Sequence, residues 1–535
     1  MDFKLLCRLL GIIAVLIGGM MAFSLPWAFA FSGSTWEQER GGFLGFLISM
    51  GLCFLAGGML IFLGRGAGRL LRKEAMAVVG LSWILATILG ALPYVLSGTQ
   101  AGPGKPMSFI DAMFEAQSGF STTGATVLTD IEDPALVPRT ILFWRSSTHF
   151  LGGLGIIVLF VAILGQGSAG KTLMRAEMPG PNKTGAQTRM QHTAWMLVFV
   201  YLALNMILAL VLVFQGLSFF TAICHAFGTM ATGGFSTYNA SIAHFETVPG
   251  LNAPLIEMTI VVFMVLAGTN FTLLHFAAVG KVNHLVEDVE WRTYITILVI
   301  VTLAVFAFGS WHGDFEENGM FPAENAEWDV DGARVFANGL RWSVFQVVSI
   351  MTTTGFCTAD FDRWNGFAQG TLLVLMFIGG CAGSTGGGLK VIRHVLFAKT
   401  LWLELEHAFH PSVVRPLRLG GKVVEDRSLH RNILVYFGLI LGIFVFAWLF
   451  TITVEPDSTW TDRGHMLEHK LRDAAGCVAA TLNNIGPGLG VIGATQNYAD
   501  FSPWTKMLFI WLMMLGRLEL FAVLVIFFPA FWRSQ

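Results

Sequence analysis

The sequence predicts an all-α polytopic membrane protein, and three observations support this prediction. The chain has 535 residues, of which 54% are hydrophobic. Only 13% of its residues are charged and its mean hydropathy is +0.65, whereas a soluble chain of this length needs a far more charged surface. Apolar runs of about 20 residues, the length of a helix that crosses a bilayer, recur along the whole chain.

Ten segments are long and apolar enough to be transmembrane helices. The first resembles a signal peptide, because Lys4 and Arg8 precede its apolar core, but this core is long for a signal sequence and further spans follow. We therefore expect it to be retained as the first helix. The predicted spans are 5–30, 43–63, 74–97, 139–165, 193–215, 254–278, 292–310, 370–397, 430–453 and 505–530.

The charge distribution predicts the orientation of these spans. If the ten spans alternate in direction, most of the 33 Lys and Arg residues fall on one side of the membrane. Cytoplasmic loops are enriched in Lys and Arg, so the basic side is assigned to the cytoplasm. The acidic loop 312–334 falls on the opposite, outer side. The only role expected of this loop is to raise the cation concentration at the outer surface of the protein.

Four further apolar segments are too short to cross the membrane. Residues 108–119, 218–229, 340–351 and 471–482 are each about a dozen residues long. As helices they would reach about 18 Å, while the hydrocarbon core is about 30 Å thick. The charge distribution requires each to count as zero crossings. We therefore expect four half-helices that enter from the outside and return as loops.

Aligned without gaps, the four short segments end in a shared glycine. The aligned stretches are SFIDAMFEAQSGFSTTG, SFFTAICHAFGTMATGG, GLRWSVFQVVSIMTTTG and KLRDAAGCVAATLNNIG. Each lies between a preceding and a following span, which makes a repeating unit. The sequence thus predicts two extra N-terminal helices plus four repeated helix–pore loop–helix units around a central pore.

The loops that follow the half-helices combine threonine and glycine and contain no Lys, Arg or His. Irregular backbone at membrane depth occurs only where protein buries it or where it lines a watery path. The negative ends of the half-helix dipoles would point at these loops, and main-chain carbonyls can replace the water around a cation. Thr/Gly clusters are also common packing residues in membranes, but four in register favour a cation pathway. The chain contains no cluster of nucleophile, base or metal ligands, so we do not expect an enzyme.

Several motifs show a family resemblance. They include QSGFSTTGAT (117–126), FWRSSTHFLGGLGI (143–156), GGCAGSTGGGLKVIR (379–393) and ATLNNIGPGLG (480–490). With these motifs the chain resembles, over nearly its whole length, the Trk/Ktr/HKT superfamily of potassium uptake proteins, and within it the bacterial TrkH/TrkG subunit. The resemblance implies a K⁺-selective pore. In plant relatives a serine at the first filter glycine accompanies Na⁺ transport, so Gly124 at this position favours K⁺.

The resemblance also implies which residues bind the transported K⁺. Main-chain carbonyls at and just before the four shared glycines would form the selectivity filter. These residues are Thr122, Thr123, Gly124, Thr232, Gly233, Gly234, Thr353, Thr354, Gly355, Asn484, Ile485 and Gly486. Because Asn484 and Ile485 stand where the other loops carry Thr or Gly, we expect a filter that is only approximately fourfold.

A glycine-rich stretch interrupts the predicted span 370–397. A phosphate-binding loop is excluded because Leu389 separates the last glycine from Lys390 and no Ser or Thr follows. Each Gly costs a helix about 1 kcal/mol relative to Ala, so we expect an intramembrane loop below the filter, which matches the gating loop of the family. A kinked packing site is the alternative. The expected gate residues are Gly379, Gly380, Gly383, Ser384, Thr385, Gly386, Gly387, Gly388, Lys390 and Arg517.

Three polar residues within predicted spans also need an explanation. A charge at the bilayer centre costs at least about 2.5–3.5 kcal/mol, so we expect Arg517 to face the pore, as the family arginine does, or a partner; a structural ion pair is the alternative. Arg145 begins its span and is expected to snorkel outward. His149, like His225 in the second half-helix, is expected to be a hydrogen-bonded packing residue and not a proton carrier.

The basic, proline-containing segment at 401–429 reads by itself as a solvated cytoplasmic connector. The resemblance implies that it contacts a TrkA-type nucleotide-binding regulatory subunit and a second copy of the chain in a homodimer. It also implies the bacterial inner (plasma) membrane, with no nucleotide site in this chain and no nucleic-acid partner. A proton- or sodium-coupled symporter is the alternative function, with Glu257 and Glu519 as candidate coupling groups.

The expected organisation follows from the spans and the repeats. The units are two N-terminal transmembrane helices (1–66), pore repeat one (67–170), pore repeat two (185–282), pore repeat three with a broken inner helix (290–400), the connector (401–429) and pore repeat four (430–535).

Overall fold

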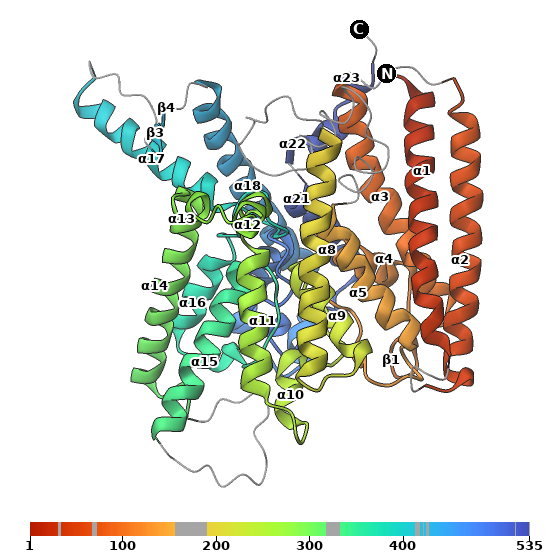
Figure 1. The fold of residues 1–535 in the computed structure, drawn as a ribbon, viewed down its shortest axis with the longest axis horizontal. Coiled ribbons are helices and arrows are strands. Elements are labelled where there is room, and N and C mark those ends of the chain that lie inside the picture. Colours follow the sequence, from red (N-terminus) through yellow and green to blue (C-terminus); the bar gives the residue numbers. More distant parts are fainter. Residues whose placement is uncertain are drawn as a thin grey trace.

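The computed structural model describes residues 1–29, 34–66, 72–155, 190–316, 332–411, 418–420, 422–423, 427–518 and 520–533. Within these residues nearly all regular structure is helical (Figure 1). Six helices are long and apolar enough to cross a membrane, or seven if one bent pair counts as a single span. The predicted fold class, an all-α polytopic membrane protein, is confirmed.

The first two helices pack side by side at one end of the molecule (Figure 1). They are α1 (Phe3–Met21), which continues as the 3₁₀ turn η1 (Ala22–Ala28), and α2 (Trp36–Leu63). Small residues allow a close approach, since a Cβ added at Gly11 would overlap the Gly57 carbonyl oxygen. Many residues of α2 remain exposed and apolar, including Leu55 and Phe62, as expected of a helix that faces lipid.

The rest of the chain forms four successive groups of helices. Each contains a long first helix, a helix that ends near the molecular centre, and a second inner helix. The first two groups are α3 (Arg72–Leu96), α4 (Phe109–Phe120), α5 (Arg139–Leu154), and α8 (Met190–Phe214), α9 (Phe219–Met230), α11 (Ala253–Ala267). The last two are α14 (Val289–His312), α15 (Gly332–Met351), α16 (Gly366–Leu375), and α18 (Arg427–Val454), α20 (Lys470–Leu482), α21 (Pro503–Arg517).

Short elements connect these helices. They are α10 (His244–Thr247), α12 (Phe271–Ala278), α13 (Asn283–Val286), α19 (Ser458–Thr461), α22 (Leu520–Leu524), α23 (Pro529–Trp532), the hairpin β1 (Gln100–Gly102) with β2 (Lys105–Pro106), and the hairpin β3 (Arg418–Leu419) with β4 (Lys422–Val423). The longer helix α17 (Val391–Phe409) follows the third group. The remaining 3₁₀ turns are η3 (Ser241–Ala243), η4 (Phe361–Arg363), η5 (Leu467–His469), η6 (Gly490–Ile492) and η7 (Val525–Phe527).

The half-helices lie close to their predicted positions, with one difference. Ser108 and Ser218 cap α4 and α9 by accepting the N–H groups of Asp111 and Thr221. The third helix, α15, begins at Gly332 and is longer than the predicted half-helix, because its extra turns pack outside the centre. There, Phe336 packs against Phe306 of α14 with ring centres 4.9 Å apart.

Three of the predicted spans are broken. Helices α11 and α12 bend by 107°, α16 and α17 are separated by residues 376–390, and α21 ends at Arg517. Of these, only the break in 370–397 was predicted. The bend after α11 is stabilised by hydrogen bonds to a segment distant in the sequence. The Cys381 N–H donates to the Gly268 carbonyl (2.8 Å), and the Phe271 N–H donates to the Gly383 carbonyl (3.0 Å). The intruding loop thus supplies hydrogen bonds that a continuous helix would have made.

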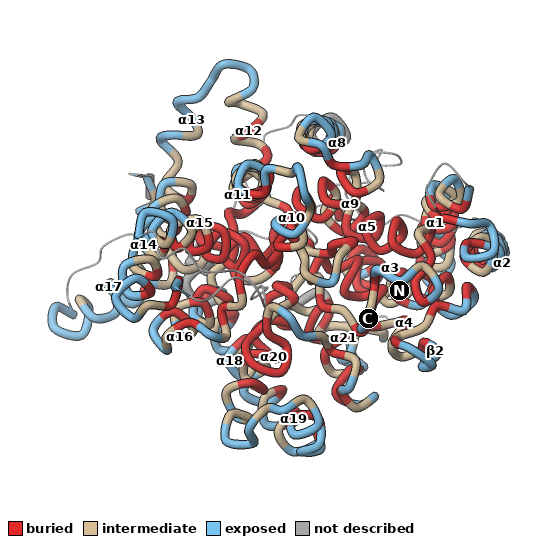
Figure 2. Tube along the Cα trace, turned by 90° about the horizontal axis from the view of Figure 1, so that it is seen from below, coloured by how far each residue is buried: buried red, intermediate tan, exposed pale blue. Residues whose placement is uncertain are grey.

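Viewed along the spans, α4, α9, α15 and α20 surround the centre of the molecule (Figure 2). The centre is buried, and exposed residues lie at the periphery and at the ends of the helices (Figure 2). The fold therefore brings the ends of four helices, widely separated in the sequence, to one place.

Candidate functional site: four converging loops and an adjacent loop

Each of the four central helices ends in the same backbone motif. At the end of α4, the Thr122 N–H donates to the Gly119 carbonyl (3.1 Å) and the Thr123 N–H donates to the Ser118 carbonyl (2.9 Å). The second bond is the six-to-one bond of a Schellman cap. The equivalent pairs of bonds are made by Thr232 and Gly233, by Thr353 and Thr354, and by Asn484 and Ile485.

The cap places a non-glycine residue in the left-handed region in all four loops. The φ angles are 54°, 53°, 59° and 56° for Thr122, Thr232, Thr353 and Asn484. Asparagine tolerates this conformation, but a β-branched threonine adopts it only under strain, which is typical of functional sites. Asn484 therefore differs from its counterparts in residue type and shares their backbone.

The four shared glycines, called here the filter glycines (Gly124, Gly234, Gly355 and Gly486), form a closed ring. All four have positive φ angles, between 79° and 96°. A Cβ added to any of them would overlap a main-chain carbonyl oxygen of the next repeat. In chain order, these oxygens belong to Gly233, Thr354, Ile485 and Thr123. Each loop thus touches the next one, and the fourth touches the first, so only glycine fits at these positions.

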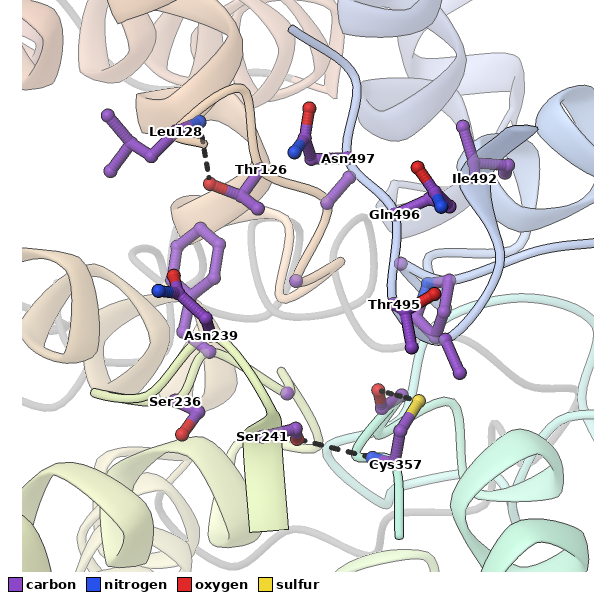
Figure 3. Close-up of a pocket in the computed structure, with 18 of the residues that line it drawn as sticks. Thr126, Leu128, Ser236, Asn239, Ser241, Cys357, Ile492, Thr495, Gln496 and Asn497 are labelled. Atoms are coloured by element: carbon purple, nitrogen blue, oxygen red, sulfur yellow. Dashed lines mark hydrogen bonds between the residues drawn. The ribbon is translucent and has the colours of Figure 1, made fainter. Parts of the chain in front are cut away.

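One cavity is lined by all four filter glycines. It also contacts residues that follow them in each repeat, such as Thr126, Asn239, Cys357 and Gln496, which surround the opening in Figure 3. The cavity therefore lies on the side from which the central helices enter. Within the described part of the chain, no three His, Cys, Asp or Glu side chains are grouped to hold a metal ion.

All twelve predicted filter residues lie in these four loops, and the threonines and Asn484 are fully buried. The Asn484 side chain links the fourth repeat to the first, because its amide donates to Thr123 Oγ1 (2.9 Å). The same amide also donates to the Met513 carbonyl (2.8 Å) within the fourth repeat. The Tyr498 hydroxyl donates to the Gly486 carbonyl (2.8 Å). The fourth loop is therefore held by side-chain contacts that its asparagine and its tyrosine neighbour provide.

The predicted gate stretch, residues 379–390, forms an irregular loop that contacts the inner ends of the filter loops. The Gly387 N–H donates to Thr353 Oγ1 (2.9 Å), and Thr385 Oγ1 donates to the Met230 carbonyl (2.9 Å). The loop also closes on itself, because the Gly379 N–H donates to the Leu389 carbonyl (2.7 Å). We call residues 379–390 the intramembrane loop.

Two cationic side chains hold this loop. The Lys390 ammonium, which is fully buried, donates to the Gly386 carbonyl. The Arg517 guanidinium donates to the Thr385 carbonyl and to the Gly152 carbonyl at the end of α5, the latter at 2.5 Å. A second, small cavity is lined by Gly386, Gly387, Gly388, Lys390, Arg393, Tyr436, Gly516, Arg517 and Leu518. The predicted gate residues are thus brought together beside the filter loops.

The structure corrects the expectation for Arg145. Its side chain is 2% exposed and does not snorkel outward, because its Nε lies 2.7 Å from Glu115 Oε1 inside the protein. His149 is a hydrogen-bonded packing residue, as predicted: Nδ1 lies 2.9 Å from the Gly119 carbonyl, and Nε2 accepts the Phe235 N–H at 3.1 Å.

Three other polar residues were considered in the sequence analysis, namely His225, Glu257 and Glu519. His225 is also a hydrogen-bonded packing residue, since its ring lies between the Thr221 carbonyl (2.8 Å) and Ser236 Oγ (3.0 Å). Glu257 is fully buried in the first turns of α11, with Arg341 Nε at 3.5 Å. Glu519 and residues 317–331 of the acidic loop lie outside the described residues.

Sequence reasoning missed several buried carboxylates, and those of Glu115 and Glu290 contact the central loops. Glu115 lies within a segment predicted to enter the membrane, where an acidic residue needs a partner. Arg145, 30 positions later in the sequence, is that partner. The acid at this depth was therefore a usable signal for a buried ion pair. Glu290 accepts the N–H of Ala382 (2.7 Å), inside the intramembrane loop, and the N–H of Ile392 (3.1 Å), just after it in α17. The sequence gives no indication of that contact.

Broken helices, four loops that meet in a ring and a cavity over that ring are the features of a multi-pass membrane transport protein. Residues 46–534 match the family model TrkH, described as a cation transport protein. The chain is 34% identical to the Trk system potassium uptake protein TrkH of Halomonas elongata and 35% identical to that of Escherichia coli K12, over the full length of all three chains. The crystal structure of the potassium transporter TrkH from Vibrio parahaemolyticus superposes with a TM-score of 0.79, at 31% identity and complete coverage of both chains.

The chain therefore belongs to the TrkH family of cation transport proteins. This membership confirms the resemblance seen in the motifs and the prediction that the chain is a transporter and not an enzyme.

Proposed function

We propose that this chain mediates potassium-selective uptake across the bacterial inner membrane through the ring of filter loops. The observation that supports this most directly is the closed contact of each filter glycine with a carbonyl oxygen of the next repeat. Carbonyl oxygens at close quarters can replace the hydration shell of an alkali cation. The names of the relatives, potassium uptake proteins, favour K⁺ as that cation.

The helices around the ring add an electrostatic argument. The ends of α4, α9, α15 and α20 that lead into the filter loops are C-terminal, and each carries a partial negative charge equivalent to about half an elementary charge. Four such ends stabilise a cation at the centre and disfavour an anion. The ions are therefore proposed to bind at the twelve filter residues predicted from the sequence.

The intramembrane loop is proposed to gate this pathway together with Lys390 and Arg517. The hydrogen bond from Gly387 to Thr353 supports this role, because it links the loop directly to a filter residue. Two positive charges at the inner end of the filter would oppose the passage of a cation until the loop moves. A displacement of the loop is therefore expected to change both the path width and the charge along it.

Control by a cytoplasmic nucleotide-binding subunit and assembly as a homodimer are proposed on the family resemblance. One feature of the fold supports a partner on this side: α17 projects from the helical bundle (Figure 1) and exposes Trp402, Leu405 and Phe409. Exposed apolar side chains on a projecting helix are typical of an interaction site. Part of the connector 401–429 lies outside the described residues.

Flux measurements on purified protein in liposomes test the proposed function. We expect uptake of Rb⁺ or K⁺ to exceed uptake of Na⁺, with and without a pH gradient. Uptake that requires a pH or Na⁺ gradient would favour the symport alternative. Equal uptake of K⁺ and Na⁺ would exclude a K⁺-selective filter in these loops.

The Gly355→Ser variant tests the assignment of the filter. A Cβ at Gly355 would overlap the Ile485 carbonyl oxygen, and φ is +80°, so the ring has to distort. We expect the ratio of Rb⁺ to Na⁺ uptake to fall by about tenfold, equivalent to about 1.4 kcal/mol. Gly464→Ser is the matched control, because φ is +76° there but nothing lies within 4 Å of an added Cβ. An unchanged ratio in Gly355→Ser would show that the assignment is wrong.

A further inference from the structure

One position of the pore repeat carries a different side chain in each copy, and this side chain is polar in the first three copies. It is the eighth column of the aligned segments, and it holds Glu115, His225, Gln346 and Cys477. In the first three repeats this side chain bonds to the segment that leaves the filter loop on its outer side. Only the first repeat uses an ion pair for this purpose among the described residues.

Glu115 holds the segment that follows Gly124. Its carboxylate accepts Thr126 Oγ1–H at 3.0 Å and the Val127 N–H at 3.1 Å. The Arg145 Nε donates to the same carboxylate at 2.7 Å. The Glu115 side chain is fully buried and the Arg145 side chain is 2% exposed, so water screens this pair only weakly.

Arg145 extends the contact into the second repeat. Its Nη1 donates to the Ser236 carbonyl (3.2 Å), two residues after Gly234. Its guanidinium also lies over the Phe235 ring, 4.1 Å from the ring centre. The ion pair therefore joins the exits of the first and second filter loops, which come from different repeats.

At the same column of the alignment, the other repeats carry neutral side chains. His225 Nε2 lies 3.0 Å from Ser236 Oγ, and the Gln346 side-chain oxygen, with its amide turned to satisfy its neighbours, accepts the Thr358 N–H at 2.8 Å. In the fourth repeat Cys477 occupies the position, and the Tyr498 hydroxyl binds the Gly486 carbonyl directly. Among the described residues, the charged connection made from this column of the repeat is therefore confined to the first two repeats.

Stability alone does not explain a buried ion pair at this place. Replacing such a pair with apolar residues is often neutral or stabilising, because both charges lose their hydration. A filter that selects by the spacing of its carbonyl oxygens, in contrast, needs the backbone behind it to be held in place. A freer loop can close around the smaller Na⁺ ion, and a fixed loop cannot.

We propose that the Glu115–Arg145 ion pair is a positioning element that sets ion discrimination at the outer end of the filter. It acts through the loop exits at Thr126, Val127 and Ser236 and does not touch the ion. This inference rests on the proposed function of the filter loops, and it adds residues that determine selectivity from behind them.

Competitive uptake into liposomes, measured as the ratio of Rb⁺ to Na⁺, tests the proposal. Glu115→Gln keeps the shape and removes the charge, and Arg145→Lys keeps the charge and removes the forked contact to the second repeat. We expect the ratio to fall by about tenfold in Glu115→Gln, equivalent to about 1.4 kcal/mol, and by less in Arg145→Lys. Rb⁺ uptake itself should persist in both.

A double variant covers the case in which a single change prevents folding. Glu115→Gln combined with Arg145→Met leaves no unpaired buried charge, and the same loss of discrimination is expected. Asp457→Asn, which removes the exposed ion pair with Lys470, and Cys477→Ala, at the same column, are the controls and should keep the wild-type ratio.

The outcomes separate the two proposals. If the wild-type protein favours Rb⁺ over Na⁺ and the variants favour it equally, the positioning role is overturned and the filter assignment stays intact. A wild-type protein that takes up Rb⁺ and Na⁺ equally would instead remove the proposed function on which this inference rests.

Discussion

Asp362 is a buried carboxyl group at the junction between the third and fourth repeats. It lies in the loop after the third filter segment, in η4, and its Oδ1 accepts the Gly490 N–H at 2.9 Å. Burial raises its pKa to about 7, with further increases from Asp360 and Asp473, while the Gly490 bond and Arg472 lower it. Its protonation therefore changes in the neutral range, close to the outer cavity.

This shift predicts how stability depends on pH. The pKa of Asp362 is raised relative to an ordinary value of 3.8, so between these values the folded protein holds a proton that the unfolded chain releases. The contribution is present at low pH and is lost as pH rises toward 7. We expect the melting temperature of the detergent-solubilised protein to decline over this range, and Asp362→Asn to decline less steeply. Parallel curves for the two proteins would contradict this.

Single residues also show where sequence reasoning stops. The threonines predicted to form the filter could be assigned to equivalent loops because they recur in register with glycine. The buried environment of Arg145 could not be predicted, because a basic residue at the start of a span normally reaches the membrane surface. Here, Glu115 in another helix supplies a buried partner, and such a pairing depends on the tertiary fold.

At the scale of elements, the intramembrane loop is held from outside the filter by one carboxylate oxygen. Glu290 Oε1, in the first turn of α14, accepts the N–H groups of both Ala382 and Ile392. Ala382 lies near the start of the loop and Ile392 lies just after its end. A single side chain therefore holds both sides of the loop. The position of the loop against Thr353 depends on this clamp.

Glu290→Ala is expected to raise uptake in the absence of any regulator. Losing two hydrogen bonds to a charged group destabilises the observed loop position, and each 1.4 kcal/mol lost raises the displaced population about tenfold. Regulator-free Rb⁺ uptake into liposomes measures this effect. Glu290→Gln, which keeps an acceptor oxygen, should change uptake less, and Glu404→Ala on the exposed surface of α17 should not change it. Lower uptake in Glu290→Ala would refute the clamp.

Breaks in helices were predictable only where the sequence itself disfavours a helix. The glycines of 379–390 predicted the interruption of the third inner helix. The 107° bend after α11 was not predicted, because Gly268 is a single glycine in an apolar run. That bend depends on hydrogen bonds to Cys381 and Gly383, which are distant in the sequence.

At the scale of the whole molecule, the ring of repeats is closed by contacts between the first and the fourth. Lys506 of α21 lies 2.6 Å from Asp111 of α4, and both are largely buried. Asn484 bonds to Thr123 across the same boundary. The alignment of the repeats predicted a ring, but a partner 395 residues away could only be seen in the fold.

Breaking this closing contact should destabilise the protein. We expect Asp111→Asn to lower the free energy of unfolding by about 1.5–3 kcal/mol, the usual range for a hydrogen bond to a charged group. Thermal unfolding of the detergent-solubilised protein measures the change. The exposed pair of Lys105 and Asp500, 3.9 Å apart, is the control; Lys105→Met should have almost no effect. Equal effects of the two substitutions would argue against a closing role.

The ring is built from one polypeptide, so each quarter of it is encoded separately. A substitution alters one of the four loops and leaves the other three unchanged, whereas in an assembly of identical subunits every change is made four times. Asn484 within an otherwise threonine-lined set is such a one-sided change. Evolution can therefore change this ring by small, asymmetric steps.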